Sequence, residues 1–296
     1  MTGTGSVLKV SGRATLTITD SSAAKSGTIT GGNAEYGGGV YVDDYAALKM
    51  TGGCITGCHA SRGGGGIYSS GNLYMGGTAK IEKCTGSDDA IWNRENSDIY
   101  ADGGTVDGTV NNQGTIKRSE GAAAVTVFNG TVYNRSAGTI IAGIYNGTVE
   151  NNGTISGGTF CGGVTIRKGS WVWERTGSIS GGTFYSSIVN EAGPERVTGV
   201  TFAVTFDRGD GTKTEPTPVK YNDLVPKPTA PTKSGYTFTG WEDANGAYDF
   251  NTPVTGPLTL TAKWEKVPSS GGNYYYHPTT DTKADDAKGS PKTADP

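Results

Sequence analysis

Short runs of alternating apolar and polar residues recur along most of the chain. Residues 14–18, 47–50 and 72–75 carry apolar side chains at every second position, which is the period of a β-strand with one buried face. No stretch keeps apolar residues at the i, i+3, i+4 and i+7 spacing of an amphipathic helix. Glycines and asparagines, which favour tight turns, separate the runs, and glycine alone accounts for 49 of the 296 residues. The pattern predicts an all-β protein built from many short strands.

These strands belong to internal repeats. Residues 28–41 (TITGGNAEYGGGVY) align with residues 54–68 (CITGCHASRGGGGIY), and Ile29, Ile55 and Ile81 follow one another at intervals of 26 positions. Repeats of this kind are typical of a solenoid, in which each period forms one coil and each strand pairs with its counterpart in the next coil. Because one coil cannot bury its apolar face alone, neighbouring coils must stack to enclose a core.

A second style of repeat extends from about residue 103 to about residue 200. Units of G-T-V or G-T-I alternate with asparagine pairs, as in residues 108–116 and 147–155, and ISGGTF occurs at 155–160 and again at 179–184. We expect about two dozen residues per coil, with three strands of three to five residues each, and asparagines stacked into hydrogen-bonded ladders at equivalent corners. A right-handed parallel β-helix over residues 1–200 is favoured over a sandwich or barrel, which would not give aligned repeats at this spacing.

The first repeats have a recognisable sequence style. The pattern G-G-G-V/I-Y at 37–41 and 64–68, preceded by I-T-G-x-x-A at 29–34 and 55–60, resembles the β-helical passenger and adhesin repeats of bacterial surface proteins. The resemblance implies an exported and usually non-catalytic protein, although polysaccharide lyases and hydrolases share the fold.

The composition changes sharply near Phe202. Residues 203–265 contain V-T-F-D at 204–207, G-Y-T-F-T-G-W at 235–241 and L-T-L-T-A-K-W at 258–264, and they closely resemble the Listeria–Bacteroides repeat of internalins. The resemblance implies a small, β-grasp-like, extracellular spacer or interaction module without catalysis. Prolines between its strands force an extended crossing segment rather than a helix. We expect the aromatic side chains to form the module core rather than a sugar-stacking platform: Phe206, Tyr236, Phe238, Trp241 and Trp264.

Residues 266–296 have few aliphatic side chains and are predicted to be a disordered, wall-proximal tail. The segment S-P-K-T-A at 290–294 resembles a variant of the L-P-x-T-G sorting signal that sortases cleave, with Pro291 and Thr293 at the matching positions. The resemblance implies attachment to the peptidoglycan of a Gram-positive cell wall. We therefore expect a signal peptide and a membrane anchor to lie outside the given sequence.

Charge and composition narrow the possible partners. The chain has 25 basic and 28 acidic side chains, so it lacks the positive surface that nucleic-acid binding requires. No apolar stretch approaches the ~20 residues of a membrane span. With two histidines, four cysteines and no C-x-x-C motif, we expect neither a zinc site nor a cofactor.

Cys58 and Cys84 are also 26 positions apart and should stack in successive coils. Strands in a sheet are about 4.8 Å apart, which lies within the Cα range of a disulfide. The pair can therefore be a disulfide or a reduced, inward-facing ladder of small apolar side chains, and the second interpretation is favoured.

Candidate catalytic groups are sparse. Acid–base pairs could come from Asp43, Asp44, Asp88 and Asp89, but these residues, like Arg62 and Arg94, are interpreted as solvated turn residues. His59 follows Cys58 directly, so their side chains should point to opposite faces of a strand. The N-x-T/S sequences are interpreted as corner residues rather than glycosylation sites: Asn129, Asn134, Asn146 and Asn152.

The sequence thus favours a non-catalytic, extracellular cell-surface protein, a structural stalk or adhesin that presents its β-helix to host glycan or protein. The alternative is a carbohydrate-active β-helix enzyme, a polysaccharide lyase or glycoside hydrolase, with the module as an accessory. The distinguishing feature would be an outward cluster of three or more ionisable side chains stacked across neighbouring coils. The repeat register indicates no such cluster.

Overall fold

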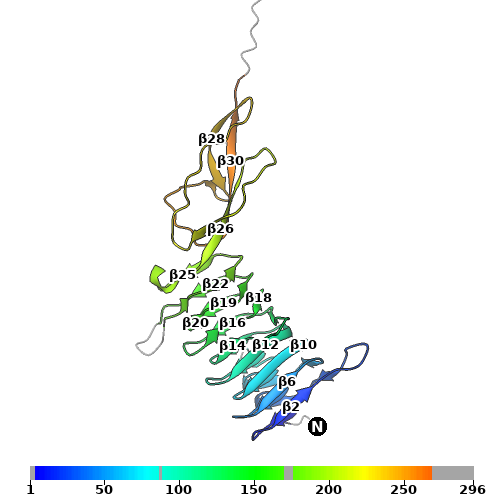
Figure 1. Ribbon diagram of the computed structural model, residues 1–296. Coiled ribbons are helices and arrows are strands. Elements are labelled where there is room, and N and C mark those ends of the chain that lie inside the picture. Colours follow the sequence, from blue (N-terminus) through cyan, green and yellow to red (C-terminus); the bar gives the residue numbers. More distant parts are fainter. Residues whose placement is uncertain (1–3, 87–88, 170–175, 269–296) are drawn as a thin grey trace, which may run out of the picture.

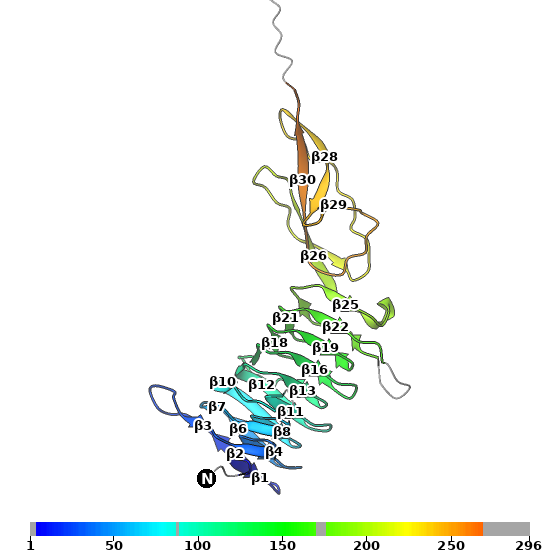
Figure 2. The ribbon, with the colours of Figure 1, turned by 180° about the vertical axis from the view of Figure 1, so that it is seen from behind.

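The computed structural model describes residues 4–86, 89–169 and 176–268, and the only helix in this part of the chain is the short 3-10 helix η1 (Pro194–Arg196). A stack of coils forms the N-terminal part, and a slender module continues from its last coil (Figures 1 and 2). All the strand pairs between coils are parallel among the described residues, which confirms the parallel β-helix and is incompatible with a sandwich.

The coils have three main faces. Face 1 is a nine-stranded sheet with the order β1 (Leu8–Val10), β5 (Val40–Val42), β9 (Ile67–Ser69), β11 (Ile91–Asn93), β13 (Val110–Asn112), β16 (Val132–Asn134), β19 (Val149–Asn151), β22 (Val164–Ile166) and β25 (Ile188–Asn190). Face 2 consists of β2 (Thr15–Ile18), β6 (Ala47–Met50), the first halves of β10 (Asn72–Glu82) and β12 (Asp98–Val106), β14 (Thr115–Lys117), β17 (Thr139–Ile140), β20 (Thr154–Ile155) and β23 (Ser178–Ile179).

Face 3 follows face 2 around each coil. It consists of β3 (Thr28–Ile29), β7 (Cys54–Thr56), the second halves of β10 and β12, β15 (Val127–Phe128), β18 (Ile144–Tyr145), β21 (Thr159–Phe160) and β24 (Thr183–Phe184). The first coils add a fourth short face from the pair β4 (Asn33–Tyr36) and β8 (His59–Gly63). Strands β10 and β12, with 11 and 9 residues, run through a bend and exceed the three to five residues predicted.

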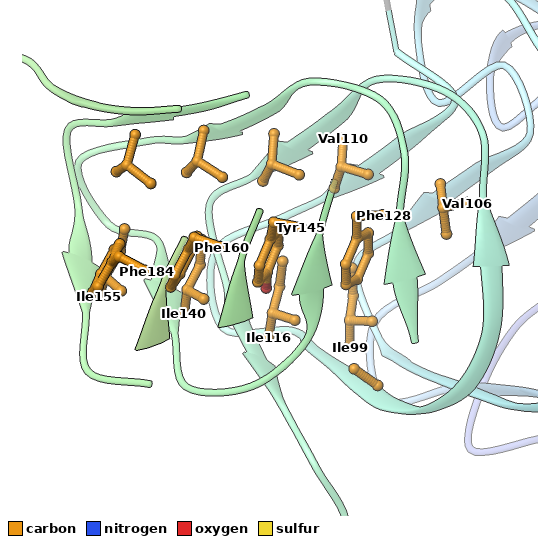
Figure 3. Packing of buried hydrophobic residues seen from close by; sticks show 14 of the residues in the cluster. Ile99, Val106, Val110, Ile116, Phe128, Ile140, Tyr145, Ile155, Phe160 and Phe184 are labelled. Carbon is orange, nitrogen blue, oxygen red and sulfur yellow. The ribbon is translucent and has the colours of Figure 1, made fainter. Parts of the chain in front are cut away.

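Ile29, Ile55 and Ile81 are direct partners in one column on face 3, which confirms the register predicted from the repeats. The column continues with Val106 and then changes to aromatic rings in the later coils (Figure 3). Rings of adjacent coils are nearly parallel, with centroids 4.7 to 5.0 Å apart, in the order Phe128, Tyr145, Phe160 and Phe184.

The coils are not uniform in length. Val40 pairs with Ile67, 27 positions on, whereas Val149 pairs with Val164, only 15 positions on. The prediction of about two dozen residues per coil is therefore wrong for the middle of the stack. Among the described residues, the coils between β13 and β22 lack the fourth face and have shorter corners, so fewer inward positions remain. Large aromatic side chains fill the interior of these coils, because fewer inward side chains must occupy the core at the usual close packing.

The C-terminal module is a five-stranded sheet with the order β27 (Thr217–Lys220), β26 (Thr201–Asp207), β30 (Leu258–Lys266), β28 (Tyr236–Asp243) and β29 (Gly246–Ala247). Its central strands β26 and β30 are parallel and the other pairs are antiparallel. The proline-containing segment 221–235 has no helix, as predicted. The module covers the end of the solenoid: Ile188 N–H donates to the carbonyl of Thr255 at 2.8 Å, and the Phe202 ring lies 6.4 Å from that of Phe184.

Candidate functional site: an aromatic surface on the first coils

Four aromatic side chains lie together on the outside of the first coils. Tyr41, Tyr68 and Trp92 occupy one outward register on face 1, on the adjacent strands β5, β9 and β11. The rings of Tyr41 and Tyr68 are stacked, with centroids 5.0 Å apart. Tyr36 of β4 joins them, 4.9 Å from Tyr68 and 6.3 Å from Trp92. We call these four residues the aromatic surface.

Glycines place this surface. Gly37 and Gly64 have φ angles of 61° and 65°, a conformation that favours glycine, and they turn the chain from the fourth face onto face 1. At Gly63 an added Cβ would lie 1.7 Å from the Trp92 ring, so the indole packs flat on the backbone of the preceding coil. The G-G-G-V/I-Y repeat therefore builds the turn and the first two rings together.

Charged and polar groups border the rings. Lys9 Nζ lies 5.1 Å from the centroid of the Tyr41 ring, and the guanidinium of Arg62 lies 5.9 Å from that of Tyr36. The hydrogen bond to the Tyr36 hydroxyl, followed by the charge of Glu35, raises the pKa of Arg62, so this cation persists. Burial is the main cause that raises the pKa of Tyr41, which keeps its hydroxyl protonated. A cavity of about 610 Å³ opens here, lined among others by Lys9, Asn33, Glu35, Tyr36, Tyr41 and Ser61.

Tyr36 and Tyr41 are half-buried and line the cavity, whereas Tyr68 is only 7 % exposed and supports them. Half-buried aromatic faces beside hydrogen-bonding groups suit a ligand that has apolar and polar sides, such as a sugar ring. The indole N–H of Trp92 is buried and has no hydrogen-bond partner among the described residues, so Trp92 supports the other rings rather than facing a ligand. Part of the aromatic surface could have been found in the sequence, because Tyr41 and Tyr68 occupy equivalent repeat positions. Trp92 likewise follows an aliphatic residue, as those two tyrosines do. Tyr36 could not be assigned, since the fourth face was not foreseen.

The predicted asparagine ladder exists, and it is buried. Asn93 donates to Asn112 at 2.8 Å, Asn112 to Asn134 at 2.8 Å and Asn134 to Asn151 at 2.7 Å, through their side-chain amides. Asn134 has no exposed surface and is therefore closed to glycosylation in the folded state. Asn129 and Asn146 form an exposed pair at another corner.

Cys58 and Cys84 are buried free thiols in successive coils. A hydrogen bond from Cys84 lowers the pKa of Cys58 to about 6. The same bond, together with burial, raises that of Cys84. His59 is exposed and its Nδ1 lies 3.1 Å from Thr85 Oγ1, on the opposite side of the strand from Cys58, as alternation predicted. The histidine and the thiol therefore cannot form a nucleophile–base pair.

The candidate acids have different positions. Asp43 and Asp44 lie at an exposed corner, but Asp89 is buried and accepts a hydrogen bond from the Asn111 amide at 3.4 Å. The interpretation of Asp89 as a solvated turn residue is therefore wrong, because the next coil covers it. Asp88 lies outside the described residues. Arg62 lies in strand β8 and pairs with Glu35 at 3.0 Å, so its interpretation as a turn residue is wrong. Arg94 is exposed at the corner 94–97 and lines one pocket with Asp44, as a solvated turn residue would.

Among the described residues, two outward clusters of three or more ionisable side chains span neighbouring coils, where the repeat register indicated none. Lys80 Nζ lies 2.7 Å from Glu82 and 3.2 Å from Asp107. Arg167 bridges Glu150 at 2.5 Å and Glu191 at 2.6 Å. The register argument missed them because partner coils differ in length. In both clusters a cation separates two carboxylates, and hydrogen bonding to Lys80 lowers the pKa of Glu82, so the groups stabilise one another's charged forms.

In the module, Phe206 and Trp241 are buried, and Phe238 and Trp264 pack against them from half-buried positions. Tyr236 is 39 % exposed and lies outside the core, contrary to the prediction, because it begins the edge of β28 beside Lys233. The sorting-signal positions Pro291 and Thr293 lie outside the described residues, as does most of the predicted tail. In the described part of the chain, no helix is long and apolar enough to cross a membrane, and no cluster of three or more metal-ligating side chains occurs.

Comparison with known proteins identifies the module. Residues 202–263 match the Listeria-Bacteroides repeat domain family, which confirms the resemblance in this part of the chain. Internalin H of Listeria monocytogenes is 36 % identical over 94 residues, which are 30 % of this chain and 16 % of internalin H. A putative Gly-rich membrane protein of Evansella cellulosilytica is 35 % identical over 68 residues, 22 % of this chain and 8 % of that protein. The chain thus spans only a small part of the relatives that it matches, and the likeness to the Listeria-Bacteroides repeat domain belongs to residues 202–263.

Proposed function

We propose that the chain is part of a non-catalytic, extracellular surface protein whose β-helix is a rigid stalk and an adhesin for glycans. The aromatic surface is the observation that carries the glycan-binding role. It offers stacked rings next to cations, a carboxylate and an amide, which is the combination that holds a sugar ring by its face and its hydroxyls.

The surface location is supported by the relatives. Internalin H and two putative membrane proteins of Evansella cellulosilytica each match a stretch of this chain. Attachment to peptidoglycan through the sorting-like segment around Pro291 and Thr293 is part of the same proposal. The attachment is tested by incubating the full chain with a purified sortase and a glycine peptide as nucleophile. Cleavage after Thr293 should join the peptide to the carbonyl of Thr293, and no joined product would contradict the attachment.

The glycan role is tested on a glycan array with the chain and two tyrosine variants. Tyr41→Ala removes one stacked ring and should weaken binding about tenfold, equivalent to about 1.4 kcal/mol. Tyr185→Ala is the matched control, because Tyr185 is 67 % exposed and follows β24, at the other end of the stack. Equal binding by both variants would remove the aromatic surface from the proposal, and binding to host protein but to no glycan would replace the ligand class.

The enzymatic alternative is tested in parallel. Neutral polysaccharides and polyuronates are incubated with the chain, and reducing ends and unsaturated products are measured. Binding without turnover supports the adhesin. Turnover that is lost on substitution of an outward carboxylate would instead show a lyase or a hydrolase.

A further inference from the structure

The corners between face 1 and face 2 alternate in length from β5 to β20. Four-residue corners protrude at 43–46, 94–97 and 135–138, and two-residue corners lie between them at 70–71, 113–114 and 152–153. Each longer corner is a β-turn closed by a hydrogen bond from its fourth N–H to its first carbonyl, at 3.2, 3.2 and 2.7 Å.

The short corners are recessed beneath the turns. An added Cβ at Gly71 would lie 2.1 Å from the carbonyl oxygen of Ala46, and one at Gly114 would lie 2.0 Å from that of Ser97. Because glycine has no Cβ, the short corner can pack directly against the backbone of the turn in the preceding coil. Since adjacent coils are about 4.8 Å apart, successive turns are separated by about twice that distance, which leaves a gap between them.

The first of these gaps is a notch between the turns 43–46 and 94–97. Its volume is about 510 Å³, its floor is formed by residues 70–72, and its walls carry Asp44, Tyr45, Arg94, Glu95 and Asn96. We call these walls and this floor the corner notch. It adjoins the aromatic surface but shares no residue with it.

Tyr45 has an unusual conformation at the edge of the notch. Its φ is 62°, in the left-handed third position of its turn, where the equivalent residue of the other turn is Asn96 with a φ of 66°. Glycine and asparagine suit that position, whereas a bulky aromatic residue is strained there. The ring is 85 % exposed, so burial does not offset the strain. A strained and exposed aromatic residue is typical of a functional position.

The charged groups of the notch are available to a ligand. Among the described residues, the side chains of Asp44, Arg94 and Glu95 form no hydrogen bond or ion pair. Two carboxylates can accept hydrogen bonds from vicinal hydroxyls, and the Arg94 guanidinium and the Asn96 amide can donate to ring or hydroxyl oxygens. Two carboxylates and one guanidinium give the notch a net negative charge, which disfavours the binding of an acidic sugar.

We propose that the corner notch is a saccharide-binding site for a neutral hexose unit, with the Tyr45 ring stacked on the sugar face and Asp44, Arg94 and Glu95 bonded to its hydroxyls. The proposal rests on the proposed glycan-binding function and assigns it a second site and a ligand class. The turn 135–138 has the same length but lacks the left-handed third residue, so the proposal concerns the notch between the first two turns.

The test uses calorimetric titration of the full chain with neutral tetrasaccharides of glucose, mannose and galactose, and with tetragalacturonate as the acidic counterpart. Tyr45→Asn places a favoured residue in the turn, so the melting temperature should stay the same or rise while neutral-sugar affinity falls at least about tenfold. Arg94→Gln should also weaken binding. The control Tyr185→Asn should bind as the unsubstituted chain does.

A preference for tetragalacturonate, or unchanged neutral-sugar affinity in both Tyr45→Asn and Arg94→Gln, would overturn the proposal. A fall in melting temperature with Tyr45→Asn would show that the tyrosine has a packing role and would equally contradict it. If binding persists in these variants but is lost in Tyr41→Ala, the notch fails and the proposed function stands. If the unsubstituted chain binds no glycan, both fail.

Discussion

The rings of Tyr145 and Phe160 lie face to face, with centroids 4.9 Å apart and planes 9° apart, although the residues are 15 positions apart in the chain. Each ring is fully buried and has another aromatic ring on both sides of it in the stack (Figure 3). This aromatic column continues the aliphatic column of the earlier coils. The long and the short coils therefore share one hydrophobic core.

Phe160→Ala should lower the free energy of unfolding by about 3–5 kcal/mol, because it removes a fully buried ring and leaves a cavity between two others. Tyr185→Ala, at an exposed position one residue beyond the column, should change it by less than about 0.5 kcal/mol. Urea unfolding followed by fluorescence measures both. Similar losses in the two variants would contradict the stacked column.

Tyr145 should make stability depend on pH above the ordinary tyrosine pKa. Complete burial raises the pKa of Tyr145 well above 10, so the folded chain retains a proton that the unfolded chain releases. Its stabilising contribution is fully present below about pH 10 and is lost as pH rises further, by up to about 1.4 kcal/mol per pH unit. Urea unfolding at about pH 8 and about pH 11 should show a steeper loss for the unsubstituted chain than for Tyr145→Phe.

The Tyr145→Phe variant should also be less stable at neutral pH, since the hydroxyl donates a hydrogen bond to the carbonyl of Ala142 at 2.7 Å. An unpaired buried carbonyl costs about 1–3 kcal/mol. Identical alkaline slopes for the two proteins would show that the phenol is accessible to solvent.

Asn134→Ala should destabilise the chain by about 1–3 kcal/mol for each buried amide group that it leaves without a partner. Asn134 accepts from Asn112 and donates to Asn151, so both neighbours are affected. Asn129→Ala is the matched control, because its hydrogen bonds with Asn146 and Asp107 are both exposed and their loss should cost less than about 0.5 kcal/mol. Thermal unfolding of the two variants distinguishes a buried ladder from a solvated one.

The four cysteines should react with a thiol reagent at very different rates. Cys161 is exposed and should react at once, Cys54 is partly exposed and should follow, and the buried Cys58 and Cys84 should react only on unfolding. Protein purified without reductant and then denatured should yield four thiols. A yield of two would show that Cys58 and Cys84 form a disulfide, the alternative that their spacing left open.

Much of the first half could be predicted because its coils keep nearly the same length. Ile29, Ile55 and Ile81 therefore occupy one inner column in the structure as they do in the aligned repeats. In the later coils, the copies of ISGGTF pair directly as well, Thr159 with Thr183 and Phe160 with Phe184, because one whole coil separates them. Where a residue type recurs at a constant spacing, the aligned sequence repeats alone predict which strands pair and in which register.

The rest depends on coil length, which local patterns do not determine. Glu150, Arg167 and Glu191 come together because one coil has 15 residues and the corners of the next are longer, and no fixed period aligns them. The corner notch was missed for the same reason. It requires both the two-coil alternation of the turns and the left-handed backbone of Tyr45, and a tyrosine is not a residue that predicts such a backbone.

The stacking of short coils is tested most directly by a pair of introduced cysteines. Thr139 and Thr154 are register partners on face 2, and neighbouring strands are within the Cα range of a disulfide. In a chain with Cys54→Ser and Cys161→Ser, the double variant Thr139→Cys, Thr154→Cys should oxidise rapidly and quantitatively to a disulfide. Thr139→Cys with Ser156→Cys, displaced by two residues along the same coil, should not. Equal rates for the two pairs, or no disulfide in the first, would contradict the 15-residue coil and with it the stalk.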